Sequence, residues 1–526
     1  MSGPAVVIGL DGVPWNLIER WTDEGELPAF ARLREEGAAG PCQSTVPALT
    51  ALAWPSIATG VRPDRHGLYA FSKLASNYSH SLHTSRDCRS PAMWDRLRSV
   101  VVNVPMTYPA TDIDGLMLTG MMTPDGATRF ASPESFGERV RREYPDYQTG
   151  LNWSDYYGRK DDLAADLADM LSVRRQLMAD LIEEDYELFF FVYTEPDRLQ
   201  HLVWDENVLL EHYRLLDDVL ADALAHVEET GGTLYVVSDH GFAPVARTAN
   251  LNTILRDNGF LEPAGESGLR GLLSRVGLTK ERTLGFLGWV GIDGADLLRY
   301  LPRRLVDSAA ANIPGDHGLF DVDHGETLAF AHGMGNIYVN RTDQFDEGTV
   351  PPAEVAAVKA DLTELFESVA DPKTGEAPLR VADGDDLFPT DQEAPDLVVE
   401  AGDNYTVSTG SLTPESFSDA TKLVADHDPE GVFFAWGADI AAGSHPENAT
   451  VFDFAPTVLH GLGEAIPEDA GGRVLTEIFR PGSEPAEATV RTTATDDRSA
   501  EDREGDDAED DFSGVEERLK GLGYME

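Results

Sequence analysis

Strand-length runs of apolar residues recur along this chain, and they constrain its fold more than any other feature. Each run is continuous enough to be buried on both faces of a sheet, as parallel strands are. The runs cover residues 5–10, 100–104, 187–193, 233–237, 395–400 and 432–436. Amphipathic helical patterns, for example at 162–184 and 207–228, lie between them. This alternation predicts an α/β fold with a doubly wound, mostly parallel sheet flanked by helices.

Acidic and histidine residues follow several of these runs. The carboxyl ends of parallel strands meet at one edge of an open sheet, where active sites gather. The fragment Asp426-His427-Asp428 has the same combination of carboxylate and imidazole. The candidate ligands are Asp11, Asp197, His201, Asp239, His240 and His427. Carboxylate oxygen and imidazole nitrogen suit Zn²⁺ or Mn²⁺, so the sequence predicts a split two-metal site. For Asp11 taken alone, a helix cap is the alternative.

The charge balance is extreme. The chain has 526 residues, with 93 acidic against 41 basic side chains and a net charge of −52. The excess is spread along the whole chain and lysine is rare, which favours a protein of a salt-accumulating, halophilic cytoplasm, where salt screens the self-repulsion. A cationic partner is the alternative. A basic face for nucleic acid is not expected.

Cysteine content and hydropathy predict a cytoplasmic, soluble protein. Cys42 and Cys88 are the only cysteines, too few for a disulfide framework. The first residues run directly into an apolar strand, without a basic segment or a cleavage site. No stretch reaches the roughly 18 uncharged apolar residues that a membrane span needs.

Composition divides the chain into a catalytic domain and a tail. Residues 1–481 carry the strand–helix alternation. Within them, residues 262–325 are rich in Leu and Arg and predict a helical insertion, either a cap over an anionic substrate or a solvated subdomain. Residues 482–511 are predicted to be a disordered acidic linker, because they have almost no large apolar side chains. Residues 512–526 predict a short amphipathic helix that docks back.

The order of the remaining motifs is specific. Thr50 stands nine residues before Thr59-Gly60, and Pro63-Asp64-Arg65-His66-Gly67 follows. Glu195-Pro196-Asp197, then His201, Ser238-Asp239-His240-Gly241 and His427 complete the series. In this order they resemble the alkaline phosphatase superfamily, in particular its type I phosphodiesterase/nucleotide pyrophosphatase branch. The resemblance implies an alkaline phosphatase-like fold from residue 5 to about residue 480.

By position, the resemblance implies a role for each candidate. One divalent cation takes Asp197, His201 and His427. The other takes Asp11, Asp239 and His240, and the Thr50 oxygen faces it. Thr50 is then the nucleophile that forms a covalent phospho-enzyme, because metal coordination activates a hydroxyl that is otherwise weakly nucleophilic. Considered alone, a threonine at this place is much more often an N-terminal residue of a helix than a nucleophile.

The chain departs from the family pattern at three places along the sequence. Ala51-Leu52-Ala53 replaces Phe-Pro-Asn after the nucleophile, and Gln200 replaces a glycine. Phe71 stands where the pyrophosphatases have an Asn that holds a phosphoryl oxygen. Asn103, at the end of a predicted strand, is a candidate replacement donor.

The predicted activity is two-metal hydrolysis of phosphodiester or phosphoanhydride bonds in a small phosphate ester. Zn²⁺ is the expected metal, with Mn²⁺ as the alternative. A phosphomonoesterase, a phosphonate hydrolase or a phosphotransferase on the same fold stays open, as does a catalytically silent binding protein. Neither the substrate nor the oligomeric state follows from the sequence.

Overall fold

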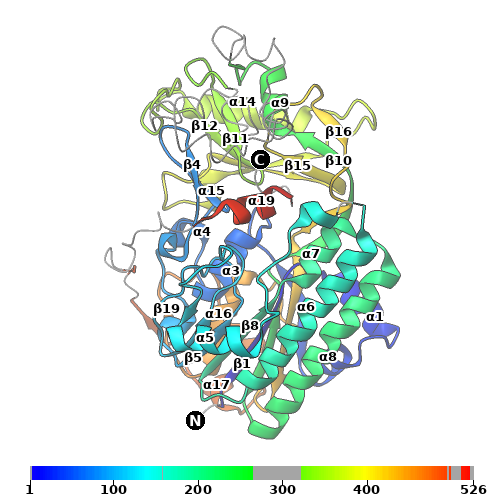
Figure 1. The fold of residues 1–526 in the computed structure, drawn as a ribbon. Helices are drawn as coiled ribbons and strands as arrows, with labels where there is room; N and C mark the ends of the chain where they lie inside the picture. The colour runs from blue at the N-terminus through cyan, green and yellow to red at the C-terminus, as the bar shows by residue number, and fades with distance from the viewer. Residues whose placement is uncertain are drawn as a thin grey trace, which may run out of the picture.

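A large mixed sheet forms the centre of the main lobe in the computed structural model (Figure 1). The structure describes residues 3–156, 158–264, 322–410, 412–494, 497–498 and 511–521. The strands of the sheet lie in the order β2 (Ala38–Gln43), β18 (Glu430–Gly437), β9 (Thr233–Val237), β1 (Ala5–Leu10), β8 (Leu188–Tyr193), β5 (Ser99–Val102), β6 (Gly115–Leu118) and β7 (Ala131–Ser132). From β9 to β6 they run parallel, which confirms the predicted fold class.

Helices cover both faces of this sheet, so each central strand is buried on both sides. Val6 and Ile8 of β1 pack into one core and Val7 into the other, which explains the continuous apolar runs. The first core is covered by α1 (Trp15–Asp23), α2 (Pro28–Glu36), α5 (Glu134–Glu143), α6 (Lys160–Leu181) and α8 (Glu206–Thr230). The second is covered by α3 (Thr50–Thr59) and α16 (Phe454–Gly461).

A smaller second lobe lies beyond the carboxyl ends of the parallel strands (Figure 1). One of its sheets contains β11 (Ala329–His332), β12 (Asn336–Val339), β14 (Leu397–Ala401) and β13 (Leu379–Asp383). The other contains β15 (Asn404–Ser408), β10 (Gly241–Asn250), β16 (Phe417–Asp419) and β17 (Ala425–Asp428). These two sheets, together with α9 (Leu251–Asp257) and α14 (Val355–Ser368), enclose a hydrophobic core separate from the two cores of the main lobe.

Two predicted strands are in a different setting from the one expected. The run 395–400 becomes β14, which is antiparallel and belongs to the second lobe instead of the main sheet. The run 432–436 becomes β18, which is in the main sheet but antiparallel to β9. The direction of β18 follows from topology. The chain returns from the second lobe along β17, so it enters the main sheet from the edge where the parallel strands end.

The tail is ordered over part of the predicted linker. Residues Glu484–Glu487 form α17, and Thr492–Thr493 form β20, which pairs with β19 (Ile466–Pro467). Backbone pairing thus holds part of a segment that has few apolar side chains. The predicted C-terminal helix is α19 (Ser513–Gly521), with Val515 and Leu519 buried. Residues 265–321, most of the predicted insertion, and residues 499–510 lie outside the described residues.

None of the described helices combines the length and the apolar character needed to cross a membrane.

Candidate metal centre

The ends of neighbouring strands bring the predicted ligands together. Asp11 follows β1, and Asp239 and His240 follow β9. Asp197 and His201 lie on α7 (Glu195–Leu202), the short helix after β8. The backbone ties these ends together, because Asp197 N donates to Asp11 O over 3.1 Å. His427 arrives from β17, which pairs with β10 so that His427 lies opposite Phe242.

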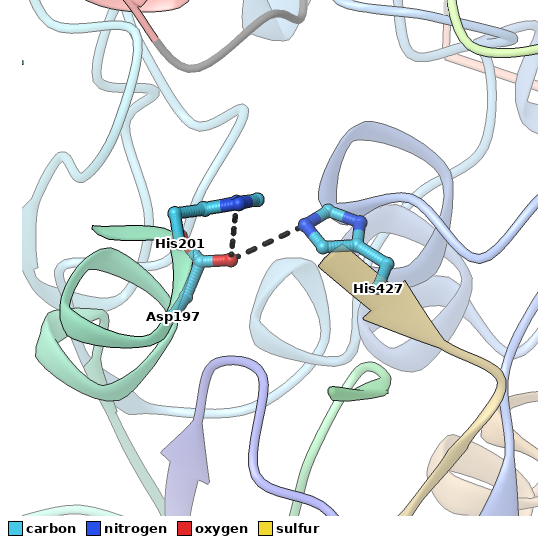
Figure 2. Close-up of side chains that lie close together, drawn as sticks. All are labelled: Asp197, His201 and His427. Atoms are coloured by element: carbon cyan, nitrogen blue, oxygen red, sulfur yellow. Dashed lines mark ion pairs between the residues drawn. The ribbon is translucent and has the colours of Figure 1, made fainter. Parts of the chain in front are cut away.

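Asp197, His201 and His427 form one cluster (Figure 2). Asp197 Oδ1 is 3.5 Å from His201 Nε2 and 3.3 Å from His427 Nε2. One ligand atom from each of the three residues lies within 4.8 Å of the others. All three side chains are almost completely shielded from solvent. The spacing suits a single cation with room for a further ligand.

A second cluster lies beside the first. It contains Asp11, His240 and again Asp197, whose ligand atoms lie within 4.8 Å of one another. His240 Nε2 is 3.7 Å from Asp11 Oδ1 and 3.2 Å from Asp239 Oδ2. Asp197 therefore reaches both clusters, a geometry that the division of ligands in the sequence did not include. The rings of His240 and His427 stack with centroids 3.7 Å apart, which places the two clusters side by side.

Backbone carbonyls orient two of the imidazoles. His240 Nδ1 donates to Gly241 O over 3.0 Å, and His427 Nδ1 donates to Ala48 O over 2.9 Å. A carbonyl oxygen only accepts, so each Nδ1 carries a proton, and Nε2 is the nitrogen that faces the carboxylates and would ligate a cation. Hydrogen bonds of this kind accompany metal-ligating histidines and fix the tautomer.

Electrostatics in the centre favour a bound cation. Burial, and then the charges of Asp239 and Asp197, raise the pKa of Asp11 well above its ordinary value, although Arg198 opposes this. Burial alone would lower the pKa of His240, but Asp239 and Asp11 outweigh it and raise that pKa to about 10. Asp11 Oδ1 is buried and accepts no hydrogen bond from any residue that the structure describes. Crowded buried carboxylates of this kind are stabilised by divalent cations, so the residues present fit them.

Thr50 faces the second cluster. It is the first residue of α3, and its Oγ1 is 3.2 Å from His240 Nε2. The residue before it, Leu49, is the N-cap, and no side chain caps this helix end. The hydroxyl of Thr50 therefore points to the metal centre, so helix capping is not its role. The amide end of α3 also faces this position, where it favours an anion.

Asn103 directly follows β5, the strand that pairs with β8, and has a positive φ of 60° and no exposed surface. Its Nδ2 donates to Val192 O over 2.6 Å, so one of its two N–H groups holds the neighbouring strand. A role for Asn103 in substrate binding stays a prediction. Phe71, which stands where the pyrophosphatases have an asparagine, is buried in the first core of the main lobe.

Several supporting residues escaped sequence reasoning. Phe242 packs edge-on against His201, with ring centroids 4.8 Å apart, and also contacts His427 at 5.3 Å. Ser238 Oγ accepts from Val13 N over 2.8 Å and donates to His240 O over 2.6 Å. Gln200 Nε2 donates to Gly12 O over 2.7 Å, and Tyr213 donates to Gln200 Oε1 over 2.9 Å. Gln200, which stands where the family has a glycine, therefore forms a buried hydrogen-bonded bridge between Gly12 and Tyr213. The only sequence signal for Ser238 was its place in the Ser-Asp-His-Gly motif.

Comparison with known proteins bears on the family and the fold of the chain. The family model of type I phosphodiesterase/nucleotide pyrophosphatase matches residues 5–430. Phosphonoacetate hydrolase from Sinorhizobium meliloti 1021, solved with phosphonoformate, has 14% sequence identity and a TM-score of 0.54, covering 88% of this chain and 95% of that one. Human ectonucleotide pyrophosphatase/phosphodiesterase 5 has 12% identity and a TM-score of 0.49, covering 88% and 95%. No curated protein matches the chain in sequence.

The structural likeness shows a shared fold, and the family model supplies the assignment. It spans the chain from β1, which precedes Asp11, to the start of β18, just after His427. Every predicted ligand and Thr50 fall inside this range. The chain belongs to the type I phosphodiesterase/nucleotide pyrophosphatase family, hydrolases of the alkaline phosphatase superfamily.

Proposed function

We propose that this protein hydrolyses phosphodiester or phosphoanhydride bonds of small substrates with two divalent cations and with Thr50 as the nucleophile. One observation carries the proposal: three carboxylates and three imidazoles from four separate segments converge beside a single threonine hydroxyl that caps no helix. Structural burial alone does not account for this set, because like-charged buried carboxylates destabilise a fold unless a cation offsets them.

The two clusters assign the ligands. Asp197, His201 and His427 would hold the first cation, and Asp11, Asp239 and His240 the second, with Asp197 close enough to serve both. When bound, such cations lower the pKa of a coordinated hydroxyl and neutralise the charge that develops on phosphoryl oxygens. We propose Zn²⁺ or Mn²⁺ on the basis of the mixed nitrogen and oxygen donors, and a salt-rich cytoplasm on the basis of the charge.

The chain itself performs the displacement in two steps. Thr50 Oγ1 loses its proton to solvent and attacks phosphorus, and the bond to the leaving alcohol or phosphate breaks. The amide end of α3 stabilises the phosphoryl charge next to Thr50. Water then attacks the phosphorus of the phosphothreonine, the bond between phosphorus and Thr50 Oγ1 breaks, and the phosphate or phosphomonoester leaves while Oγ1 takes up a proton. The buried ring stack of His240 and His427 keeps the ligands in place during both steps.

The test compares variants at the two ends of α3. Thr50→Val keeps the shape of the side chain but removes the nucleophile, so turnover of bis(p-nitrophenyl) phosphate should fall by at least about a thousandfold. Thr50→Ser should retain part of the rate. Thr59→Val is the matched control, because Thr59 Oγ1 donates to Pro55 O over 2.7 Å and accepts from Val61 N over 3.4 Å, and neither partner is a predicted ligand. Turnover by Thr50→Val close to the unmodified rate would exclude the covalent mechanism.

A phosphonate hydrolase is the second candidate, because phosphonoacetate hydrolase has the same fold. Parallel assays with bis(p-nitrophenyl) phosphate, p-nitrophenyl phosphate and phosphonoacetate separate the diesterase, monoesterase and phosphonate alternatives. The diesterase proposal predicts the highest kcat/KM for the first substrate among these three. Adding simple alcohols and analysing the products tests for transfer.

A further inference from the structure

The C-terminal helix α19 lies between the two lobes, at the edge of the main sheet where the parallel strands end (Figure 1). Along this edge β9, β1 and β8 lead to the metal centre, and β5 and β6 are the next two strands. Phe512, just before α19, meets the ring of Tyr108 in the loop after β5, with centroids 6.0 Å apart. Arg518 donates to Asp125 Oδ1 over 2.8 Å and to Thr123 O over 3.0 Å, both in the loop after β6. The helix therefore covers the part of the sheet edge beside the metal centre.

The helix also reaches the residue next to a predicted metal ligand. Val515 and Leu519 of α19 line one small cavity together with Arg198 of α7, which directly follows Asp197. The cavity measures about 10 Å³, enough for about one water molecule. With α19 docked, the space between this helix, α7 and the loops after β5 and β6 is thus nearly filled by the protein itself.

The opposite side of the metal centre is closed by backbone hydrogen bonds. Ser44 N donates to Pro429 O over 2.9 Å, and His427 Nδ1 donates to Ala48 O over 2.9 Å. These bonds tie the segment before Thr50 to the segment that carries His427. The sheet edge continues in the other direction, toward β5 and β6. Ligands of open α/β sheets lie in a crevice outside the carboxyl ends of the strands, so a substrate with its phosphoryl group beside Thr50 extends toward the place that α19 occupies.

Few contacts hold α19 in this place. The helix has nine residues, of which Val515 and Leu519 are buried. A helix of this length is marginal in water on its own, so its structure depends on docking. Elements with few buried apolar contacts open at a free-energy cost well below that of global unfolding. The main lobe therefore stays folded when α19 leaves it.

We propose that α19 is an autoinhibitory element. When docked, it occupies the subsite for the part of the substrate that lies beyond the reacting phosphoryl group, and its release admits larger esters. This inference rests on the proposed function. Docked α19 and a bulky ester exclude each other, so each weakens the binding of the other by the same factor. The size of the ester group that stays on phosphorus decides how strongly the docked helix inhibits.

The experiment releases α19 in the full-length chain with the double variant Val515→Ala/Leu519→Ala, and hydrogen exchange of the α19 amides measures the release. Methyl p-nitrophenyl phosphate and bis(p-nitrophenyl) phosphate, which share a leaving group and differ in the other ester group, are assayed with excess metal. The double variant should raise kcat/KM for the bis ester by about tenfold or more, and for the methyl ester by less. Glu517→Ala, on the exposed side of α19, is the control and should leave both values unchanged.

A second measurement does not depend on turnover. Thr50→Val, which keeps the predicted metal ligands, is saturated with bis(p-nitrophenyl) phosphate while exchange of the α19 amides is followed. The bound ester should accelerate this exchange, whereas inorganic phosphate, which is small enough to leave α19 docked, should not. Exchange that is unchanged or slower with the bound ester would contradict the inference.

The kinetic outcome that overturns the inference is equally definite. If α19 exchanges faster in the double variant and the ratio of kcat/KM for the two esters stays at its original value, α19 only packs on the main lobe. Loss of turnover of both esters in a double variant with unchanged metal content would also refute autoinhibition, because activity would then require the docked helix.

Failure of this inference is distinguishable from failure of the proposed function. Metal-dependent turnover of the methyl ester by the unmodified protein tests the function alone, because a small ester group does not need the place of α19. If that turnover is present and release of α19 leaves the ratio of the two esters unchanged, only the inference fails. If neither the unmodified protein nor the double variant turns over either ester, the proposed function fails.

Discussion

Asp197 connects the two halves of the candidate site. Its carboxylate lies 3.3 Å from His427 and 3.5 Å from His201, and it also belongs to the group with Asp11 and His240. Burial is the largest single influence and would raise the pKa of Asp197, but His201 and His427 together outweigh it and keep that pKa well below its ordinary value. The side chain is therefore ionised and available to cations over the ordinary pH range.

Replacing Asp197 should affect both cations. We expect Asp197→Asn to lower the metal content to less than half of the unmodified value, because an amide oxygen carries no charge and serves neither cluster well. Elemental analysis after gel filtration measures this. Asp217→Asn is the matched control: Asp217 is also buried, but it accepts from the backbone of Ala29 and Phe30, over 2.9 and 3.0 Å. Full metal content in Asp197→Asn would contradict the ligand assignment.

Gln200 should stabilise the fold. Gln200→Ala removes both the bond to Gly12 O and the bond from Tyr213, and leaves two buried polar groups without partners. We expect the free energy of unfolding to fall by about 1–3 kcal/mol. Tyr213→Phe, which removes only one of the bonds, should cost less. Chemical denaturation in constant high salt gives both values, and equal stability of Gln200→Ala and the unmodified protein would refute the bridge.

At the scale of elements, the strands that carry the site were predictable and their surroundings were less so. The runs at 5–10, 187–193 and 233–237 appear as β1, β8 and β9 because each alternates its side chains between two cores. β14 has the same apolar character, but pattern alone does not say which core a strand enters. The second lobe was not predicted for this reason.

The docking of α19 depends on two side chains. Val515 and Leu519 are 2% and 1% exposed, so Leu519→Ala should weaken docking by about 2–4 kcal/mol. Glu517→Ala is the control, because Glu517 is on the exposed side of the helix. Hydrogen exchange of the α19 amides and limited proteolysis of the tail should both accelerate in Leu519→Ala alone. Unchanged exchange would show that the ring contact of Phe512 with Tyr108 and the hydrogen bonds of Arg518 to Asp125 and Thr123 are sufficient to hold the helix.

At the scale of the whole molecule, charge sets the conditions in which the fold persists. A net charge of −52 causes self-repulsion that salt screens, since the Debye length falls from about 10 Å at 0.1 M to about 3 Å at 1 M. We expect the melting temperature to rise steeply between 0.1 and about 2 M KCl. An uncharged osmolyte at equal osmolality is the control. An equal rise with the osmolyte would show that screening is not the cause.

Removing metal should destabilise the same molecule. A ligand that binds only the folded state, present at about a hundred times its Kd, adds about 2.7 kcal/mol to the free energy of unfolding. We expect a chelator to lower the melting temperature in molar salt and added Zn²⁺ or Mn²⁺ to restore it. The Asp197→Asn variant, which has lost its ligand set, should respond weakly to the chelator. Equal melting curves with and without chelator would argue against buried cations.

How much of the site could be predicted depends on which of its residues belong to recognisable sequence motifs. The ligands and Thr50 sit in short motifs whose order along the chain is itself informative, and the structure brings them together. Their roles remain proposals. Phe242 carries no such signal, because its position against two imidazoles exists only in the folded chain.

The most direct test of the central claim is the metal content of protein purified in high salt without chelator. Two cations per chain are what the paired clusters predict, and elemental analysis should find about two equivalents of zinc or manganese. Fewer than one equivalent, with none regained when metal is added, would contradict the two-metal site. The protein would then have the fold of the family without metal-dependent catalysis.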